Sequence, residues 1–284
     1  MLTQIDTVDG FRKALDAERL AGRTVGLVPT MGALHAGHAA LMERAAAECD
    51  VAAVTIFVNP LQFAPTEDLA AYPRDLDGDR RAAAGAGAQL LFTPSETEMY
   101  PGGRDAVTTV SVPGLGTHLE GRTRPTHFDG VATVVAKLFA IAGPCRAYFG
   151  EKDFQQLAVI RRLVSDLSIP VEVIACPTVR DDDGLALSSR NAYLTAAERA
   201  VAPVLHRALR AGIAAIEAGE RDAAAVRTVM SAIVGAEPLA TLDYAEVVDA
   251  HDLTVPARLA GELRLLIAAR LGRARLIDNM GVTV

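Results

Sequence analysis

Two histidines three residues apart follow a short apolar segment near the start of the chain. His35 and His38 stand in the stretch P-T-M-G-A-L-H-A-G-H, which spans residues 29–38. Residues three apart at a helix start lie on one face, so both imidazole rings can be directed at one anion. The two glycines allow close approach of a ligand, and unbonded amides at a helix start favour phosphate. The stretch predicts a site for a phosphate-bearing ligand.

A structural role for the two histidines is the simpler alternative. His35 and His38 could cap the helix or pack against it without touching a ligand. A metal site is less favoured, because no Cys, Asp or Glu stands beside the pair at the spacing of metal ligands. The residue types alone leave the structural and the anion-binding interpretations open.

Three further polar runs carry groups suited to a nucleotide or to a small acid. Gln62, in N-P-L-Q-F, has an amide that can both donate to and accept from hydroxyls and a carboxylate. Lys152, in F-G-E-K-D, can neutralise developing phosphate charge, with Gln156 one helical turn away. The run L-S-S-R-N at 187–191 combines two hydroxyls with a guanidinium that binds two oxygens at once. Each run could also be an ordinary turn, cap or surface loop.

The segments around these runs alternate between strand and helix patterns. Short apolar, β-branched segments predict strands, and apolar residues three and four apart predict helices. Each candidate turn follows a strand at its carboxyl end, where open α/β sheets bind ligands. The predicted order is helix 7–20, strand 24–28, a helix from 39, strand 51–58, helix 75–86, strand 89–92, a β-prone run 106–112, helix 128–142, strand 147–149, helix 153–167 and strand 171–175.

A second domain is predicted beyond residue 176, where the pattern changes. Helices are expected over 196–218 and 223–234, and three later apolar segments suit a small antiparallel sheet, at 242–248, 263–268 and 275–278. The predicted fold class is therefore α/β, with a doubly wound (Rossmann-like) parallel sheet over residues 1–176 and a smaller C-terminal α+β domain over residues 177–284.

Composition and charge narrow the class of protein. The 284 residues are 50% hydrophobic and carry a formal net charge of −7, which fits a globular protein and argues against nucleic acid or an anionic membrane as its main partner. Cys49, Cys145 and Cys176 are widely spaced and odd in number, as expected for thiols in a reducing compartment. Neither a signal peptide nor a membrane span is predicted, so a cytoplasmic location is expected.

Six motifs, in order along the chain, resemble those of the pantothenate synthetase family. They are P-T-M-G-A-L-H-A-G-H, F-V-N-P-L-Q-F, Y-P-R-D, H-F-D-G, Y-F-G-E-K-D-F-Q-Q and R-D-D-D-G-L-A-L-S-S-R-N. The H-x-G-H element also resembles that of nucleotidyltransferases and class I aminoacyl-tRNA synthetases. The L-S-S-R-N run resembles the family's counterpart of the synthetases' mobile phosphate-binding loop. Met is usual in the family where this chain has Leu187, a swap that conserves volume.

The resemblance implies an ATP-dependent ligase that forms a C–N (amide) bond. The expected reaction condenses (R)-pantoate with β-alanine to give pantothenate, AMP and pyrophosphate through a pantoyl adenylate, on the way to coenzyme A. ATP is the expected cosubstrate, with Mg²⁺, and neither nucleic acid nor a membrane is an expected partner. The first domain is expected to bind nucleotide and pantoate and the second to serve as a lid. A homodimer is expected.

The resemblance also implies roles for individual residues. His38 is the expected proton donor, His35 and Lys152 are further catalytic residues, and the charge argument allows His35 a purely electrostatic part. Gln62 and Gln156 are expected to bind the substrates, pantoate in particular. No metal ligands are assigned. The residues expected to bind ATP are Met31, Gly32, Ala33, Leu34, His35, Ala36, Gly37, His38, Gly150, Glu151, Lys152, Asp153, Val179, Leu187, Ser188, Ser189 and Arg190.

Two other classes of protein stay open on the residues alone. A different adenylyltransferase would share the H-x-G-H turn, but it requires a further basic group for the second phosphate of its substrate. A non-catalytic nucleotide-binding protein has no need to keep His38 together with Lys152. P-loop NTPases are removed, because the chain lacks a Walker loop. Release of AMP with and without pantoate and β-alanine separates the three classes.

Overall fold

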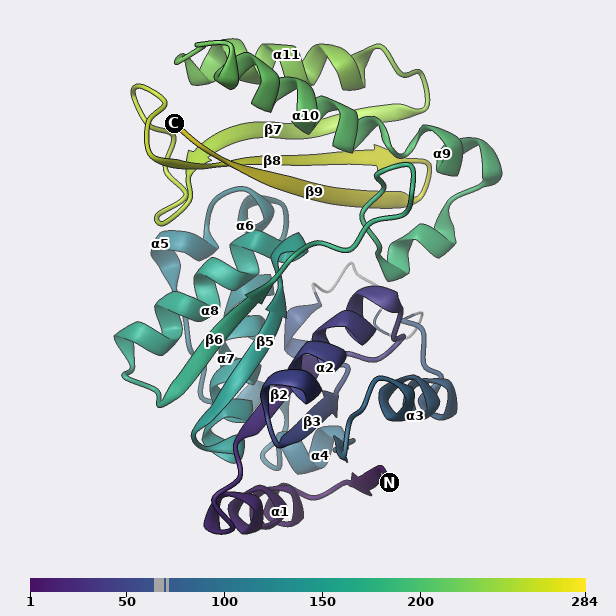
Figure 1. The fold of residues 1–284 in the computed structure, drawn as a ribbon, viewed down its shortest axis with the longest axis vertical. Helices are drawn as coiled ribbons and strands as arrows, with labels where there is room; N and C mark the ends of the chain where they lie inside the picture. Colours follow the sequence, from purple (N-terminus) through teal and green to yellow (C-terminus); the bar gives the residue numbers. More distant parts are fainter. Residues whose placement is uncertain (64–68, 70–71) are drawn as a thin grey trace. The chain divides into compact units, whose positions relative to one another are not determined.

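The computed structural model describes residues 1–63, 69 and 72–284, which divide into two compact units (Figure 1). Unit 1 comprises Met1–Glu151 and Gln155–Pro177, and unit 2 comprises Lys152–Phe154 and Thr178–Val284. The short segment Lys152–Phe154 is thus separated in sequence from the rest of unit 2. The chain enters unit 2 twice.

Unit 1 is built on a six-stranded parallel sheet, which confirms the predicted doubly wound α/β fold. The strands are β1 (Thr3–Ile5), β2 (Val25–Thr30), β3 (Val51–Ile56), β4 (Leu90–Phe92), β5 (Cys145–Gly150) and β6 (Val171–Cys176). Their order is β1-β4-β3-β2-β5-β6, and every pair of neighbours runs parallel. The chain adds β3 and β4 on one side of β2, and β5 and β6 on the other. The topological switch point, where such sheets bind ligands, therefore lies between β2 and β5.

The strand order determines on which face of the sheet each helix lies. Right-handed crossovers that run in opposite directions along the sheet place their helices on opposite faces. Helix α2 packs beside α3, and α1 packs beside α7. The helices of this part of the chain are α1 (Val8–Leu20), α2 (Ala36–Glu48), α3 (Leu76–Gly85), α4 (Glu96–Met99), α5 (Pro113–Gly116), α6 (Glu120–Thr123), α7 (His127–Ala142) and α8 (Phe154–Asp166), with the short 3₁₀ turns η1 (Pro60–Gln62), η2 (Arg104–Ala106) and η3 (Glu151–Asp153).

Two local expectations for unit 1 differ from the structure. The three-residue strand β1 was not predicted, although it pairs with β4 at the edge of the sheet. The β-prone run at 106–112 forms no strand. There the amide of Val110 donates to Oγ1 of Thr133 at 2.9 Å, so a side chain on α7 takes the place of a neighbouring strand.

Unit 2 combines an antiparallel sheet with two long helices, as expected from the sequence. The sheet has the order β7 (Ala240–Asp249), β8 (Glu262–Leu271), β9 (Ala274–Thr283). Helices α10 (Val204–Glu217) and α11 (Ala223–Gly235) pack on each other and on this sheet (Figure 1). The predicted helix 196–218 is in fact two, because Pro203 has no amide proton and separates α9 (Ala196–Val201) from α10.

The core of unit 2 lies between its helices and its sheet. Leu209, Met230 and Leu265 are fully buried there. Gly212 on α10 allows this close packing, since a Cβ at its position would stand 2.7 Å from Leu265 Cδ2. Unit 2 thus has a hydrophobic core of its own.

Candidate active site

The turn that joins β2 to α2 has an unusual backbone. Gly32 and Ala33 both have positive φ, 84° and 52° respectively, which is common for glycine and rare for alanine. The amides of Ala33 and Leu34 donate to the buried carboxylate of Asp79 at 3.0 and 2.8 Å. The amide of Gly32 donates to Thr30 Oγ1 at 3.2 Å. The protein itself therefore satisfies three successive amides of this turn.

The two predicted catalytic histidines close the first turn of α2. His35 is the N-cap residue, and its Nδ1 accepts from the amide of Gly37 at 3.1 Å. His38 Nδ1 accepts from the amide of His35 at 3.4 Å, which completes a reciprocal capping box. The ring centroids lie 4.1 Å apart. Both histidines therefore cap the helix, which is the structural role proposed above as the alternative to anion binding.

Capping also determines which ring nitrogen of each histidine carries the proton. An imidazole whose Nδ1 accepts a hydrogen bond carries its proton, when neutral, on Nε2. Both His35 and His38 accept at Nδ1, so both present Nε2–H as a donor. The amides of Gly37, His38 and Ala39 are already bonded to His35. These three amides are therefore not unbonded, and phosphate binding at this helix start stays a prediction.

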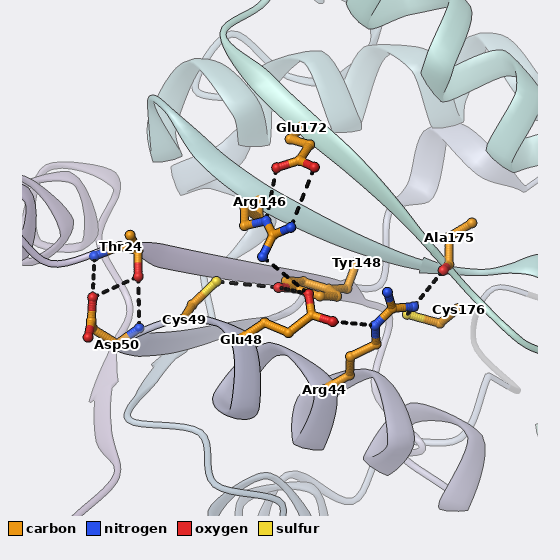
Figure 2. Close-up of polar contacts among 10 residues, drawn as sticks. All are labelled: Thr24, Arg44, Glu48, Cys49, Asp50, Arg146, Tyr148, Glu172, Ala175 and Cys176. Carbon is orange, nitrogen blue, oxygen red and sulfur yellow. Dashed lines mark hydrogen bonds and ion pairs between the residues drawn. The ribbon is translucent and has the colours of Figure 1, made fainter.

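The far end of α2 is tied to β5 and β6 by a polar network (Figure 2). Arg44 Nη1 donates to the carbonyl of Ala175 at 2.7 Å, and Arg44 Nε donates to Glu48 at 2.8 Å. Glu48 also accepts from Tyr148 Oη at 3.0 Å and pairs with Arg146 at 3.3 Å. The hydrogen bond from Arg44 holds the pKa of Glu48 below its usual value. This network orients the helix that carries the two histidines.

The three cysteines are unpaired thiols. Cys49 and Cys176 are buried, and Cys49 Sγ lies 3.3 Å from Tyr148 Oη. Burial raises the pKa of Cys145 to about 12. A thiol with so high a pKa is protonated at neutral pH and therefore unreactive.

Gln62 lies in η1, directly after β3, and a neighbouring asparagine fixes its amide. Gln62 is 7% exposed, and its Oε1 accepts from Asn59 Nδ2 at 2.9 Å. Asn59 Oδ1 in turn accepts from Tyr100 Oη at 2.8 Å. Burial raises the pKa of Tyr100, so its hydroxyl stays protonated and can donate. The contact with Asn59 orients the amide of Gln62, whose Nε2 is the group suited to donate to a carboxylate or hydroxyl.

The H-F-D-G motif at 127–130 supports η1 from the start of α7. His127 Nδ1 lies 3.0 Å from the carbonyl of Gln62, and Arg124 Nη2 donates to the same carbonyl at 3.2 Å. Gly130 is required for this packing, because a Cβ there would stand 2.2 Å from the carbonyl oxygen of Leu61. The motif therefore positions Gln62, a role that the sequence did not predict.

Gln155 and Gln156 are adjacent, but they have different surroundings. Gln155 is 3% exposed, and its Nε2 donates to the carbonyls of Leu115 and His118 at 2.8 Å each. Its Oε1 accepts from the amide of Glu120 at 3.0 Å. Gln156 is half-buried and makes none of these contacts. Gln155 supports the loop at 115–120, which leaves Gln156 as the glutamine suited to a ligand.

Residues 150–153 leave the carboxyl end of β5, the strand beside β2. Gly150 pairs with Cys176 at the end of the sheet. The side chain of Lys152 is mostly buried, with Nζ 3.7 Å from Asp153 Oδ1. The carbonyl of Lys152 accepts from Asn279 Nδ2 at 2.8 Å, and both residues belong to unit 2.

The remaining predicted ATP residues lie in unit 2, on one hairpin and on the short 3₁₀ turn that follows it. The amide of Leu187 donates to the carbonyl of Val179 at 3.0 Å, so these two residues lie side by side. The turn between them contains Gly184, with a φ of 93°. Beyond the hairpin, Ser188 caps η4 (Ser189–Tyr193) by accepting from the amide of Arg190 at 3.3 Å. Within the described residues Arg190 makes no ion pair.

Ion pairs fix this hairpin to the rest of unit 2. Arg180 binds the buried carboxylate of Asp278 through two hydrogen bonds, at 2.6 and 2.8 Å. Arg199 binds Asp181 at 2.8 Å and Asp183 at 2.5 Å. The hydrogen bond from Arg199 lowers the pKa of Asp183. The hairpin is therefore a defined element rather than an unsupported surface loop.

The described residues were also compared with what a metal site and a membrane span require. They contain no group of three or more His, Cys, Asp or Glu that could hold a metal ion. Mg²⁺ commonly binds through substrate phosphates and water with only one or two carboxylates, so Mg²⁺ that arrives with ATP requires no such group. Among the helices in the described part of the chain, none has the length and hydropathy needed to cross a bilayer.

Comparison with known proteins gives matches over nearly the whole chain. The family model for Pantoate-beta-alanine ligase matches residues 3–281. The pantothenate synthetase of Thioalkalivibrio sulfidiphilus is 56% identical over 278 residues, which cover 98% of this chain and 97% of that protein. The pantothenate synthetase of Moorella thermoacetica is 50% identical over 280 residues, which cover 99% of this chain and 98% of that protein.

Solved structures also match over nearly the whole chain. The crystal structure of pantothenate synthetase from Thermus thermophilus superposes with a TM-score of 0.93 at 47% identity and covers 100% of both chains. That of pantoate-beta-alanine ligase from Francisella tularensis, complexed with Beta-gamma ATP and Beta-alanine, gives a TM-score of 0.80 at 34% identity. It covers 99% of this chain and 97% of that chain.

Proposed function

This chain belongs to the pantoate-β-alanine ligase family and is a ligase of that kind, and from this premise we propose that it works through a pantoyl adenylate. In the first step the pantoate carboxylate attacks the α-phosphorus of ATP, and pyrophosphate leaves. In the second step the amine of β-alanine attacks the acyl carbon, the amide bond forms, and AMP leaves. The product, pantothenate, is a precursor of coenzyme A.

The observation that carries this proposal is the capping box at the start of α2. It sets the neutral tautomer of His35 and His38 with the proton on Nε2. Attack of the pantoate carboxylate on the α-phosphorus requires that the protein position the reactants and place hydrogen-bond donors where charge develops. It does not require a covalent nucleophile. We assign His38 as the proton donor, with His35 and Lys152 stabilising the phosphate charge.

Substrate contacts are assigned from the amide geometry. Asn59 orients the amide of Gln62 by donating to its oxygen, and Nε2–H of Gln62 suits a carboxylate or hydroxyl of pantoate. Gln156 is assigned to pantoate as the second amide, while Gln155 is committed to the protein. This pairing favours a small hydroxy acid over a phosphate-bearing substrate.

ATP enters as its Mg²⁺ complex. We assign to it residues 31–38 and 150–153, together with Leu187, and we place Val179 against the adenine and Ser188, Ser189 and Arg190 on the phosphates. We further propose that residues 1–176 are the nucleotide- and pantoate-binding domain, that residues 177–284 act as a lid that keeps water from the adenylate, and that the protein is a homodimer. A cytoplasmic location stays a prediction.

A pyrophosphate burst tests the mechanism. Enzyme mixed with MgATP and pantoate alone should release up to one pyrophosphate per site and then stop, and β-alanine should restart turnover with release of AMP. His38→Ala and Lys152→Ala should slow the burst by a factor of roughly 10² to 10³, since each removes stabilisation of charge in the transition state. Exposed counterparts provide matched controls: His251→Ala and Lys13→Ala should burst like the unmodified enzyme.

A second measurement confines the loss to the first step. Supplied with chemically made pantoyl adenylate, His38→Ala and Lys152→Ala should form pantothenate far better than they do from ATP. Pyrophosphate that appears only with β-alanine present would contradict the adenylate route. Release of ADP and phosphate in place of AMP and pyrophosphate would contradict it as well.

A further inference from the structure

A buried carboxylate lies against the turn that precedes the two histidines. Asp79, near the start of α3, is 5% exposed. Its Oδ2 accepts from the amide of Ala33 at 3.0 Å, and its Oδ1 accepts from the amide of Leu34 at 2.8 Å. One carboxylate thus binds two successive amides, from a residue 46 positions away from Ala33 in the sequence.

The turn requires such support because its backbone conformation is unfavourable. Ala33 has a φ of 52°, where its Cβ crowds the backbone. Gly32, at 84°, escapes that penalty, and a Cβ there would stand 2.8 Å from Asp79 Oδ2. The carboxylate therefore excludes a side chain at Gly32 and stabilises the left-handed conformation of Ala33.

The turn also sets the geometry of the histidines. Leu34 directly precedes His35, whose amide donates to His38 Nδ1 and whose Nδ1 accepts from Gly37. A change in the backbone at Ala33 or Leu34 is transmitted to the amide of His35 and so to the tautomer of His38.

We propose that Asp79 is a positioning residue for the ATP-dependent step, a role that rests on the proposed function of the histidines. It acts by holding the backbone from Gly32 to Leu34 in the conformation that sets the hydrogen bonds of His35 and His38. We assign it no contact with substrate, since each of its oxygens accepts a backbone amide and the residue is 5% exposed.

Substitution Asp79→Asn tests this role. The amide keeps the shape, but its NH₂ faces a backbone N–H and one of the two hydrogen bonds is lost. We expect the pyrophosphate burst to slow at least tenfold and the KM for ATP to rise, with the KM for pantoate changed less than twofold. Asp77→Asn is the matched control, because Asp77 is an exposed carboxylate on the same turn of α3. It should leave the burst unchanged.

A rescue variant separates positioning from a general effect on folding. Glycine adopts positive φ without strain, so Ala33→Gly in the Asp79→Asn background should raise the burst rate at least threefold above that of Asp79→Asn alone. The effect of Ala33→Gly alone is measured as well, and the gain in the double variant is taken relative to it, so that any effect of the glycine on ATP binding is divided out. A double variant no faster than Asp79→Asn overturns the proposal. So does a double variant that fails to fold together with Asp79→Asn, which would make Asp79 a general structural residue.

Imidazole ¹⁵N chemical shifts provide a readout that does not depend on activity. The resonances of His38 should show a proton on Nε2 in the unmodified protein, a mixture of tautomers in Asp79→Asn, and the original pattern in the double variant. If those shifts behave as expected while no adenylate forms, the proposed function fails and the positioning role of Asp79 stands. Unchanged His38 shifts in Asp79→Asn overturn the positioning role, whatever the burst shows.

Discussion

Hydrogen bonds within the protein determine which atom each site residue can offer to a ligand. His35 and His38 accept amides at Nδ1 and so present Nε2–H, and Gln62 accepts from Asn59 and so presents its NH₂. The residue types show that imidazoles and an amide are present. They do not show which nitrogen or oxygen is committed to the protein, and the chemistry depends on that commitment.

The adjacent glutamines allow a test at this scale. Gln155→Ala should lower the free energy of unfolding by about 2 kcal/mol or more, because the buried partners of its three hydrogen bonds are left unsatisfied. Gln156→Ala should change stability little and raise the KM for pantoate, by a factor of roughly 10 for a lost hydrogen bond of about 1–3 kcal/mol. Urea unfolding and initial rates at saturating ATP measure the two effects. The assignment is contradicted if Gln156→Ala raises the Kd for ATP as much as the KM for pantoate.

At the scale of elements, sequence patterns predict the long strands and helices well. Apolar runs identify β2, β3, β5 and β6 to within a few residues. The signal is continuous in β2 and β3, because a central parallel strand is apolar on both faces, and it is interrupted by Arg146 in β5 and by Glu172 in edge strand β6. Edge strand β1 is only three residues long and largely exposed, so it carries no such signal. Pro203 was visible in the sequence, and its missing amide would have placed the break between α9 and α10.

Some residues of the candidate site could be predicted from the sequence, and others could not. Short-range motifs such as H-A-G-H and G-E-K-D could be found in the sequence, since their residues are neighbours in the chain. Asp79 could not, because its contact with Ala33 spans 46 positions and depends on the packing of α3 beside α2. Asn59 was visible before Pro60, but an Asn-Pro pair is most often only a turn, and nothing local shows that it binds Gln62.

The start of α10 should make the stability of unit 2 depend on pH. His206 lies against Gly184, and burial lowers the pKa of His206 below its ordinary 6.5, with the charges of Arg180 and Arg210 acting in the same direction and Asp278 opposing them. A lowered pKa means that the unfolded chain binds the proton more readily. The contribution of His206 to stability is therefore fully present above about pH 6.5 and is lost as pH falls below that value through the lower pKa of the folded protein.

Replacing this histidine should flatten that dependence. Urea unfolding monitored by circular dichroism measures the effect. Between about pH 7.5 and about pH 5.5, the urea midpoint of His206→Gln should fall less than that of the unmodified protein. His251→Gln is the control, because the His251 side chain is 77% exposed and should leave the dependence as it was. An equal drop in all three proteins would show that His206 does not titrate on unfolding in this range.

At the scale of the whole molecule, the proposed ligand contacts are divided between the two units. The residues assigned to pantoate, Gln62 and Gln156, belong to unit 1, as do the two histidines. Lys152 belongs to unit 2, as do the residues assigned to ATP on the hairpin and on η4, such as Val179 and Arg190. Each unit has its own buried core. A ligand that contacts one unit therefore stabilises that unit directly, and a ligand that contacts both stabilises both.

Hydrogen exchange with single ligands tests this division. Pantoate alone should slow exchange only in peptides of unit 1. MgATP alone should slow it in unit 1 and in residues 178–190 of unit 2. At a ligand concentration of about 100 times Kd, the added stability is about 2.7 kcal/mol, enough to slow globally limited exchange roughly 100-fold. Arg190→Ala should reduce protection of residues 178–190 by MgATP and leave protection of unit 1 by pantoate unchanged. The assignment is wrong if pantoate alone protects residues 178–190, or if MgATP leaves them as they are in the unliganded protein.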